Sequence, residues 1–449
     1  MVAHRLNKEQ ARRIAIHAQL LDLPRPTDLV DVVDRLTILQ IDATAAIAPS
    51  ADLVLWSRLG STYDPAELTM AIEKDRTLIE TVAYIRSPRD LPAVIAEGRA
   101  QMHPSGAAWF EENEPFRRDI LALLEKEGPL LSRDIPDTSI VPWPSSGWTN
   151  NRNVTKMLEI LARHGHVAIS GRKGRQRYWD LPQRVYPADL PTLDLNTAVR
   201  HRNKRRLAAL GIARSTGQQI PGETPYVGDG GEEAIVEGTP GTWRVYPAYV
   251  GLPFEGRTAL LSPFDRLIHD RVRTEQLFGF EYILEMYKPK DERRWGYFAL
   301  PILHDDRLVG KLDATADRKA KTLVVNAIHQ DVRFTKTMTA AVRAEIEDLA
   351  AWLGLKSPAH RTVVRRGSDR RLHAKAAPLA SGVRPVPPPA ARRWVHARRD
   401  RDLVTLRGPL AGEKQSGPAG SQSRNGPVGW AVCHRLHRCR PSPSHCGPP

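Results

Sequence analysis

The stretch of sequence most informative about the fold is His166-Val167-Ala168-Ile169-Ser170-Gly171-Arg172-Lys173-Gly174-Arg175-Gln176-Arg177-Tyr178-Trp179-Asp180. Its two ends, residues 166–169 and 176–180, are rich in the β-branched and aromatic side chains that strands favour. Residues 171–175 between them contain two glycines and three basic side chains, so they predict a turn. We therefore expect a β-hairpin with a basic tip.

Two amphipathic helices are predicted before this hairpin. They span residues 115–128 and 150–165, and both carry apolar side chains three and four positions apart. Asn150 and Asn151 are expected to cap the second helix. Helices followed by a basic hairpin form a winged helix, which we expect over residues 111–190.

Polar side chains of this unit lie where a winged helix meets DNA. Apolar residues occupy one side of the second helix, so the opposite side presents Arg152, Asn153 and Lys156 to a groove. Four bases within six positions of the hairpin can span successive phosphates: Arg172, Lys173, Arg175 and Arg177. The alternative is a solvated turn, which would carry the same charges.

Comparable units are expected on both sides. Residues 1–110 open with Asn7 and Gln10 in capping-box positions and continue as a helical unit. Residues 191–256 begin with a basic helix and end in a second hairpin, formed by residues 233–236 and 243–245.

The pattern changes to strands after residue 257. Strands are predicted at 282–287, 296–302 and 307–312, with a helix at 337–353. The expected fold class is therefore α+β. It comprises tandem winged-helix domains at residues 1–110, 111–190 and 191–256, a small C-terminal β-rich domain at 257–355, and a disordered basic tail at 356–449.

The charge of the chain is concentrated in this tail. The chain has 66 lysines and arginines, 51 acidic residues and a net charge of +15. Nineteen of these bases and only four of the acids lie in residues 356–449, so residues 1–355 are neutral overall. Total charge therefore says nothing about whether residues 1–355 bind nucleic acid, and only local clusters bear on that question.

The tail also lacks helical and strand periodicity, so we expect it to be disordered. Its cysteines and histidines have no flanking fold that would orient them around zinc: Cys433, His434, His437, Cys439, His445 and Cys446. Three explanations remain open, namely a solvated tail, a DNA-tethering arm and an out-of-frame translation.

Residues 1–355 contain no cysteine, and no run approaches 18 apolar residues. The N-terminus leads into a charged helix rather than an apolar signal segment. We therefore expect a soluble, monomeric, cytoplasmic protein that binds no membrane.

Gln40-Ile41-Asp42 is the strongest candidate for chemistry. A helix capped at Thr27 is predicted before it, and residues 38–42 alternate with period two. As a strand, these residues would bury their apolar side chains and turn Gln40 and Asp42 to the opposite face. A carboxylate can activate a water molecule that a neighbouring carboxamide orients. The alternative is a solvated strand edge.

Several blocks of sequence occur together in a recognisable order. The longest is Leu260-Leu261-Ser262-Pro263-Phe264-Asp265-Arg266-Leu267-Ile268-His269-Asp270-Arg271, and shorter blocks lie at 55–60, 178–182, 296–301 and 309–313. Over residues 5–355 the chain resembles the AlkZ/YcaQ family of bacterial DNA glycosylases. The signature residues of the long block are Ser262, Pro263, Phe264, Asp265, Asp270 and Arg271. His269 stands where the family often has tryptophan.

The resemblance implies tandem winged helices and a β domain around a DNA channel. It also implies excision of alkylated purines, including the unhooking of interstrand crosslinks joined through guanine N7. Gln40-Ile41-Asp42 matches the Gln-apolar-Asp catalytic motif of the YcaQ-like branch, which makes Gln40 and Asp42 the expected catalytic residues. The expected partner is double-stranded DNA with alkylated or crosslinked guanine, and no metal or other cofactor is expected. No lysine stands out as a nucleophile, so a monofunctional enzyme is expected.

A non-enzymatic winged-helix transcriptional regulator is the competing interpretation. It would use the same basic hairpin, bind a specific operator, and have no need of Gln40 and Asp42. Release of the base from DNA that contains 7-methylguanine distinguishes the two.

Overall fold

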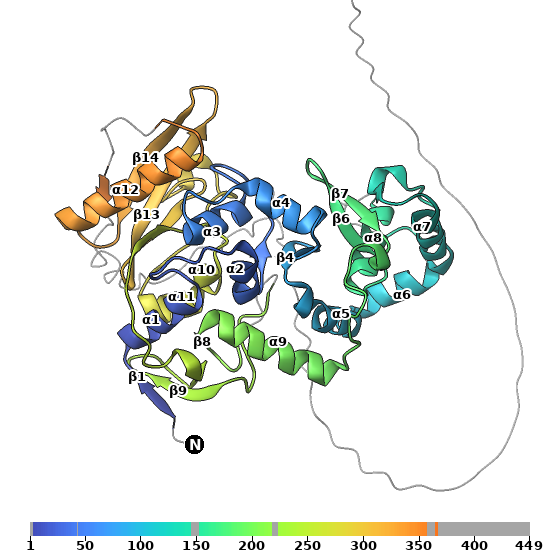
Figure 1. Ribbon diagram of the computed structural model, residues 1–449, viewed down its shortest axis with the longest axis horizontal. Coiled ribbons are helices and arrows are strands. Elements are labelled where there is room, and N and C mark those ends of the chain that lie inside the picture. The colour runs from blue at the N-terminus through green and yellow to red at the C-terminus, as the bar shows by residue number, and fades with distance from the viewer. Residues whose placement is uncertain (1–2, 43, 145–151, 218–222, 357–363, 367–449) are drawn as a thin grey trace, which may run out of the picture. The chain divides into compact units, whose positions relative to one another are not determined.

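The computed structural model of the chain describes residues 3–42, 44–144, 152–217, 223–356 and 364–366. These residues form twelve α-helices and three β-sheets, so the predicted α+β class is confirmed (Figure 1). The chain divides into two units, residues 1–375 and 376–449. The second unit lies outside the described residues, as does most of the tail predicted to be disordered.

The largest sheet connects Gln40 with the basic hairpin. Its strands lie in the order β2 (Leu39–Gln40), β4 (Tyr84–Arg86), β3 (Ile79–Thr81), β6 (Ala168–Lys173), β7 (Gln176–Asp180) and β5 (Leu130–Leu131). The predicted hairpin is confirmed as β6 and β7, although its first strand begins at Ala168 rather than His166. A single residue pair, Glu80 with Ile169, joins β3 to β6 and so connects the two parts of the sheet.

The two helices predicted before the hairpin are α7 (Glu114–Glu127) and α8 (Asn153–Arg163). Their apolar sides pack with the hairpin residue Trp179 in one core, beside α5 (Leu91–Ala100) and α6 (Pro104–Glu112). The predicted caps Asn150 and Asn151 lie outside the described residues. Arg152 occupies the N-cap position of α8 and makes no side-chain cap.

A four-stranded sheet joins the start of the chain to residues 212–245. Its order is β1 (His4–Leu6), β9 (Glu232–Val236), β10 (Trp243–Val245) and β8 (Ile212–Ala213). The second predicted hairpin is therefore confirmed as β9 and β10. The predicted capping box of Asn7 and Gln10 is also confirmed, at the start of α1 (Lys8–Ala18), which contacts α9 (Leu195–Leu210). Because sheets cross the expected domain boundaries at 110 and 190, the division into folding units stays a prediction.

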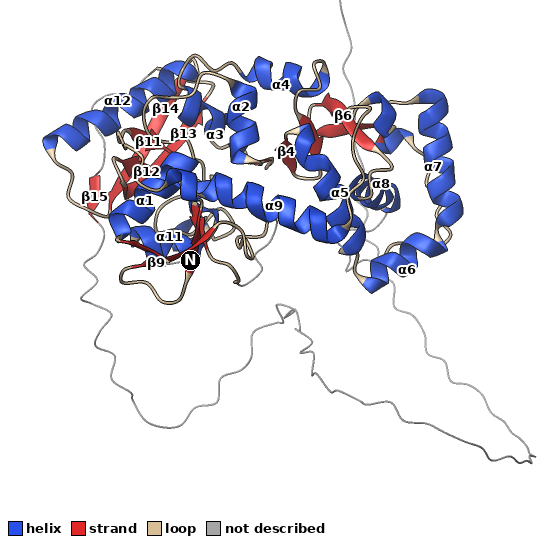
Figure 2. Ribbon diagram, turned by 60° about the horizontal axis from the view of Figure 1, so that its bottom comes forward, coloured by secondary structure: helices blue, strands red, loops and turns tan. Residues whose placement is uncertain are grey.

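The five-stranded sheet has the order β11 (Thr258–Leu260), β12 (Leu300–His304), β13 (Arg307–Asp317), β14 (Thr322–Gln330) and β15 (Val364–Arg366). Helix α12 (Lys336–Trp352) lies along this sheet, as Figure 2 shows, and buries Val342, Ile346 and Leu349 against it. The predicted strands at 307–312 and helix at 337–353 therefore correspond to β13 and α12.

Three predictions in this region are wrong. Residues 282–287 form a loop rather than a strand, and only Tyr282 and Glu285 of this loop are buried. β12 begins at Leu300 rather than residue 296, because Gly296, with φ 118°, departs from extended backbone. Finally, β15 lies within the tail that was predicted to be disordered. It pairs with β14 through the backbone, and such pairing leaves no side-chain periodicity in so short a strand.

The remaining helices are α2 (Leu29–Leu36), α3 (Ser50–Leu59), α4 (Pro65–Glu73), α10 (Arg266–His269) and α11 (Arg271–Phe278). Three of them, α2, α3 and α10, line a cavity together with Gln40. The cap of α2 is Asp28 rather than Thr27, because the Asp28 carboxylate accepts the Asp31 N–H at 2.7 Å. One apolar core extends from α2 and α3 to α12 and the five-stranded sheet. β2 therefore ends against a rigid support.

Candidate active site

The Gln40-Ile41-Asp42 segment lies at the edge of the six-stranded sheet. Helix α2 ends at Thr37, whose left-handed backbone (φ 64°) turns the chain into β2. Only two residues form this strand, although the Ile41 N–H still donates to the Ala83 carbonyl at 2.9 Å. The strand predicted at 38–42 is therefore too long, and Asp42 lies in the loop beyond it.

The Asp42 carboxylate is only partly engaged. Its Oδ1 accepts the backbone N–H of Thr44 at 2.8 Å, which closes a turn of the kind aspartate favours. Among the described residues the other oxygen has no hydrogen bond or ion pair, and the residue is half-buried. An ionised carboxylate offers about four acceptor sites. Asp42 therefore retains capacity to bind water or face a developing positive charge.

Gln40 lines a small cavity between β2 and helices α2, α3 and α10. The cavity volume is ≈ 10 Å³, about the space that one water molecule needs. The Gln40 carbonyl accepts from the Ser50 hydroxyl at 2.5 Å, while its side-chain amide has no partner among the described residues. The lining residues are Leu36, Ile38, Leu39, Gln40, Val54, Phe264, Arg266 and His269.

His269 reaches the same cavity from the end of α10. Burial, followed by the charges of Arg266 and Arg271, lowers the pKa of its imidazole to about 4. The ring is therefore neutral at physiological pH and can accept or donate a hydrogen bond. In the sequence this position stood out only as a departure from the family pattern, and it is the fold that places it beside Gln40.

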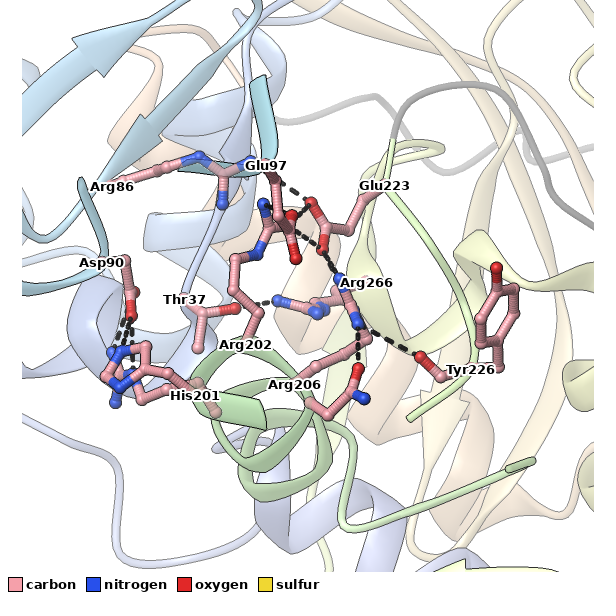
Figure 3. Close-up of polar contacts among 12 residues, drawn as sticks. Thr37, Arg86, Asp90, Glu97, His201, Arg202, Arg206, Glu223, Tyr226 and Arg266 are labelled. Atoms are coloured by element: carbon pink, nitrogen blue, oxygen red, sulfur yellow. Dashed lines mark hydrogen bonds and ion pairs between the residues drawn. The ribbon is translucent and has the colours of Figure 1, made fainter. Parts of the chain in front are cut away.

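Buried arginines gather around the carboxylate of Glu223, as Figure 3 shows. Gln40 lies opposite Tyr84 in the β2–β4 register, so Gln40, Tyr84 and Arg86 share one face of this strand pair. Arg86, Arg202 and Arg206 all bind Glu223, at 3.2, 2.6 and 2.8 Å. Burial raises the pKa of Glu223, but the arginines, led by Arg202, hold it well below its usual range.

Positive charge exceeds negative charge in this cluster. Arg86, Arg202, Arg206 and Arg266 face Glu223, with Glu97 as a second partner of Arg202 at 2.7 Å. The buried Nε of Arg86 has no hydrogen-bond partner. Burial, partly opposed by Glu223, lowers the pKa of Arg266 to about 9, so this guanidinium remains charged at pH 7. The surplus creates a positive potential that favours a polyanion near Gln40.

Two of the sequence blocks meet beneath this site in a buried ion pair. Arg58, from the block at 55–60, donates to both oxygens of Asp265 in the long block, and both side chains are 0% exposed. Arg58 also donates to the Gln19 carbonyl at 3.0 Å, and Asp265 accepts the Leu267 N–H that begins α10. The pair fixes the helix that carries His269.

The other signature residues also bind their own chain. Ser262 accepts the Phe264 N–H at 3.3 Å, and Asp270 caps α11 by accepting the Arg273 N–H at 3.0 Å. Arg271 donates to the carbonyls of Ile268 and Pro263. These contacts indicate that the signature residues support the cavity wall, and Phe264 is the one among them that lines the cavity.

Two of the four basic side chains of the hairpin are bound to Glu80, so only the other two are available for contacts outside the protein. Glu80 is 3% exposed and accepts two bonds from Arg172, each of 2.6 Å, and one from Arg177 at 3.1 Å. Lys173 and Arg175 are exposed and have no partner among the described residues. The structure therefore assigns Arg172 and Arg177 to positioning the hairpin, and leaves its tip with two uncommitted charges.

The second predicted DNA surface, on α8, is partly occupied by its own chain. Asn153 accepts the Trp143 N–H at 2.8 Å and donates to Asp137 at 2.9 Å. The Lys156 ammonium lies 4.4 Å from the centre of the Trp143 ring, and burial lowers its pKa. Loop 137–143 therefore packs against part of this side of α8, and DNA contact by Asn153 and Lys156 stays a prediction. Arg152 is exposed.

The described part of the chain contains neither a candidate metal centre nor a membrane-spanning helix. No group of three or more His, Cys, Asp or Glu side chains in this part of the chain could hold a metal ion. The Cys/His cluster of residues 433–446 lies outside the described residues. No described helix is both long and apolar enough to cross a membrane.

Comparison with known proteins agrees with this architecture. The structure is similar to that of the Streptomyces sahachiroi DNA glycosylase AlkZ, with a TM-score of 0.55 and 18% sequence identity, over 81% of this chain and 100% of the other. At that identity the likeness concerns the fold alone. The sequence model of the family described as "DNA glycosylase AlkZ-like" matches residues 33–220 and 227–352. These residues make up more than half of the chain and include both Gln40 and Asp42. The chain therefore belongs to the AlkZ-like DNA glycosylase family.

Proposed function

We propose that this protein is a monofunctional DNA glycosylase that hydrolyses the N-glycosidic bond of N7-alkylated purines, including guanines joined in interstrand crosslinks. The observation that carries the proposal is the partly engaged Asp42 carboxylate, two residues from an unpartnered Gln40 amide, in a chain of a DNA glycosylase family. No cofactor takes part in the proposed reaction.

The chemistry of the lesion suits this limited set of groups. Alkylation at N7 makes guanine cationic, so the base departs as a neutral molecule without being protonated. The N9–C1′ bond breaks, its electron pair leaves with the base, and the sugar acquires oxocarbenium character. The enzyme must then stabilise a cation and deliver water, rather than supply a strong acid.

Asp42 and Gln40 divide these two tasks. The Asp42 carboxylate faces the cationic sugar and accepts a proton from the attacking water, whose oxygen bonds to C1′. The Gln40 amide orients that water by donating or accepting a hydrogen bond. His269, with its pKa lowered to about 4, adds no positive charge that would oppose the oxocarbenium ion.

Binding of double-stranded DNA in this proposal uses tandem winged-helix units. The tip of the β6–β7 hairpin supplies phosphate contacts through Lys173 and Arg175, and the start of α8 supplies Arg152. Arg172, Arg177, Asn153 and Lys156 hold these surfaces in place. We propose a cytoplasmic monomer that binds no membrane.

The test uses the full chain and two duplexes under single-turnover conditions. One contains a single 7-methylguanine and the other a guanine–guanine crosslink joined through N7. We expect release of 7-methylguanine, unhooking of the crosslink, and no release of uracil from a matched duplex, because uracil carries no positive charge in DNA and would have to leave as an anion. Sequence-specific binding to an operator without release of any base would favour the regulator instead.

A further inference from the structure

A rigid turn presents one aromatic side chain next to the loop that carries Asp42. Residues 285–288 form this turn, which is closed by a bond from the Lys288 N–H to the Glu285 carbonyl at 3.0 Å. Met286 and Tyr287 are its two central residues. Tyr287 is 84% exposed, more than any other large hydrophobic side chain in the described part of the chain.

The turn is braced from below by a buried carboxylate. Glu285 is 2% exposed and accepts the Trp295 N–H at 2.7 Å and the Lys288 ammonium at 2.8 Å. Arg293 donates to the Lys288 carbonyl at 2.9 Å and so closes the other end. An exposed ring on a turn with this many internal bonds keeps its position, so little conformational entropy is lost when a ligand contacts it.

Two contacts connect the turn to Asp42. The Thr44 hydroxyl lies 3.6 Å from the Met286 sulfur, and the Thr44 N–H donates to Asp42 at 2.8 Å. Tyr287 is therefore the neighbour in sequence of Met286, which contacts Thr44, and Thr44 in turn binds the Asp42 carboxylate proposed to face the target sugar. In DNA bound at this site, the aromatic group available to the Tyr287 ring is a nucleobase next to that sugar.

The usual explanation for an exposed tyrosine is simple tolerance of single apolar residues at the surface. Two features argue against it here. The ring protrudes from a braced turn rather than lying flat on the protein, and it lies next to a candidate catalytic loop. Proteins that distort duplex DNA insert such side chains at a base step, and aromatic rings stack on bases that lose a neighbour.

From this geometry we propose that Tyr287 is a DNA-binding residue whose ring stacks on a nucleobase next to the damaged nucleotide, filling the gap that displacement or loss of the damaged base leaves. The inference rests on the proposed glycosylase function and adds a contact to the same site. It requires no proton transfer from Tyr287, so the ring rather than the hydroxyl carries the effect.

The experiment measures binding rather than catalysis. Fluorescence anisotropy gives the Kd of the full chain for a duplex with one tetrahydrofuran abasic analogue and for the same duplex without damage. We expect Tyr287→Ala to weaken binding to the abasic duplex about 5- to 100-fold, the range for loss of one base–aromatic stack, with a smaller effect on undamaged DNA. Tyr287→Phe should bind like the wild type, and so should the control Lys290→Ala, which changes another exposed residue nearby.

Two outcomes would overturn the inference. One is an unchanged Kd for Tyr287→Ala, and the other is equal weakening by Tyr287→Phe, which would assign the effect to the hydroxyl. These results are distinct from failure of the proposed function. In that case the wild-type protein would neither prefer the abasic duplex nor release 7-methylguanine. Thermal unfolding of each variant identifies loss of affinity caused by misfolding.

Discussion

Asp265 and Asp42 are both acidic residues in the motifs that the sequence predicts to matter, yet the fold places them in opposite environments. Asp265 is 0% exposed, and both of its oxygens bind the equally buried Arg58. Asp42 is half-buried at the end of a two-residue strand, and one backbone N–H binds one of its oxygens. The buried Asp265 carboxylate therefore cannot bind a ligand, whereas the Asp42 carboxylate can still accept further hydrogen bonds.

The difference separates residues that build a site from residues that act in it. A fully paired buried charge cannot approach DNA without a large desolvation penalty, so Asp265 serves the scaffold. A carboxylate with open acceptor positions can change partners during a reaction at little cost. The same distinction applies to the hairpin, where Arg172 is committed to Glu80 while Lys173 is exposed.

The largest expected effect comes from breaking the buried pair. Asp265→Asn removes the charge that compensates Arg58 and should cost about 3–5 kcal/mol of unfolding free energy, as a single cut in a buried ion pair does. Urea unfolding measures this loss. The double variant Arg58→Met with Asp265→Leu is the matched control and should recover much of the stability. An unchanged urea midpoint for Asp265→Asn would show that the pair does not support the fold.

Replacement of Asp42 should have the opposite effect, with a small change in stability and a large loss of activity. Asp42→Asn keeps an acceptor for the Thr44 N–H, so the unfolding free energy should change by less than about 0.5 kcal/mol. Excision of 7-methylguanine should fall about a hundredfold, because both the base and the stabilising charge are lost. Gln40→Ala should lower the single-turnover rate less, by about tenfold, since orientation of water is weakened while its proton acceptor remains. A near wild-type rate for Asp42→Asn would contradict the assignment.

Local patterns predicted the parts of the fold that local interactions specify. The hairpins β6–β7 and β9–β10 and helices α7, α8 and α12 follow from apolar periodicity and turn residues. The motif of Gln40 and Asp42 was also visible, because it lies within three consecutive residues.

Long-range features left no comparable signal. β1 pairs in parallel with β9 through backbone groups, and the Arg58–Asp265 contact joins residues 207 positions apart. The sequence likewise marked Arg172 and Arg177 as DNA contacts of the same kind as Lys173, because the partner Glu80 lies in a distant strand. For His269 and Tyr287, the decisive property is which residues the fold brings beside them.

The hairpin allows the same comparison to be made with basic residues, because Arg172 is paired with Glu80 while Lys173 and Arg175 are exposed. The double variant Lys173→Ala with Arg175→Ala should lower the slope of log affinity against log salt by about 1.8, because each lost phosphate contact removes about 0.9. Arg172→Ala should leave this slope unchanged and instead lower the urea midpoint, because it removes the Arg172–Glu80 ion pair. Affinity measured from 50 to 200 mM salt tests both. Equal slopes for the double variant and the wild type would show that Lys173 and Arg175 make no contacts with DNA phosphates.

The smallest expected effect concerns His269, a half-buried group that must stay neutral. Burial, with the charges of Arg266 and Arg271, lowers its pKa to about 4 in the folded protein, against about 6.5 in an unfolded chain. Between these values the unfolded chain binds more protons, so stability from this residue is complete above about pH 6.5 and decreases as the pH falls toward 4. From pH 7.5 to 5.0 the wild type should lose on the order of 2 kcal/mol through His269. His269→Gln should lack this part of the loss, while His164, whose pKa burial also lowers to about 4, titrates in both proteins. Urea unfolding at the two pH values gives the difference. An equal acid-induced loss in the two proteins would show that the imidazole beside Gln40 is not held neutral by the fold, and the inference that His269 adds no positive charge next to the oxocarbenium ion would fail with it.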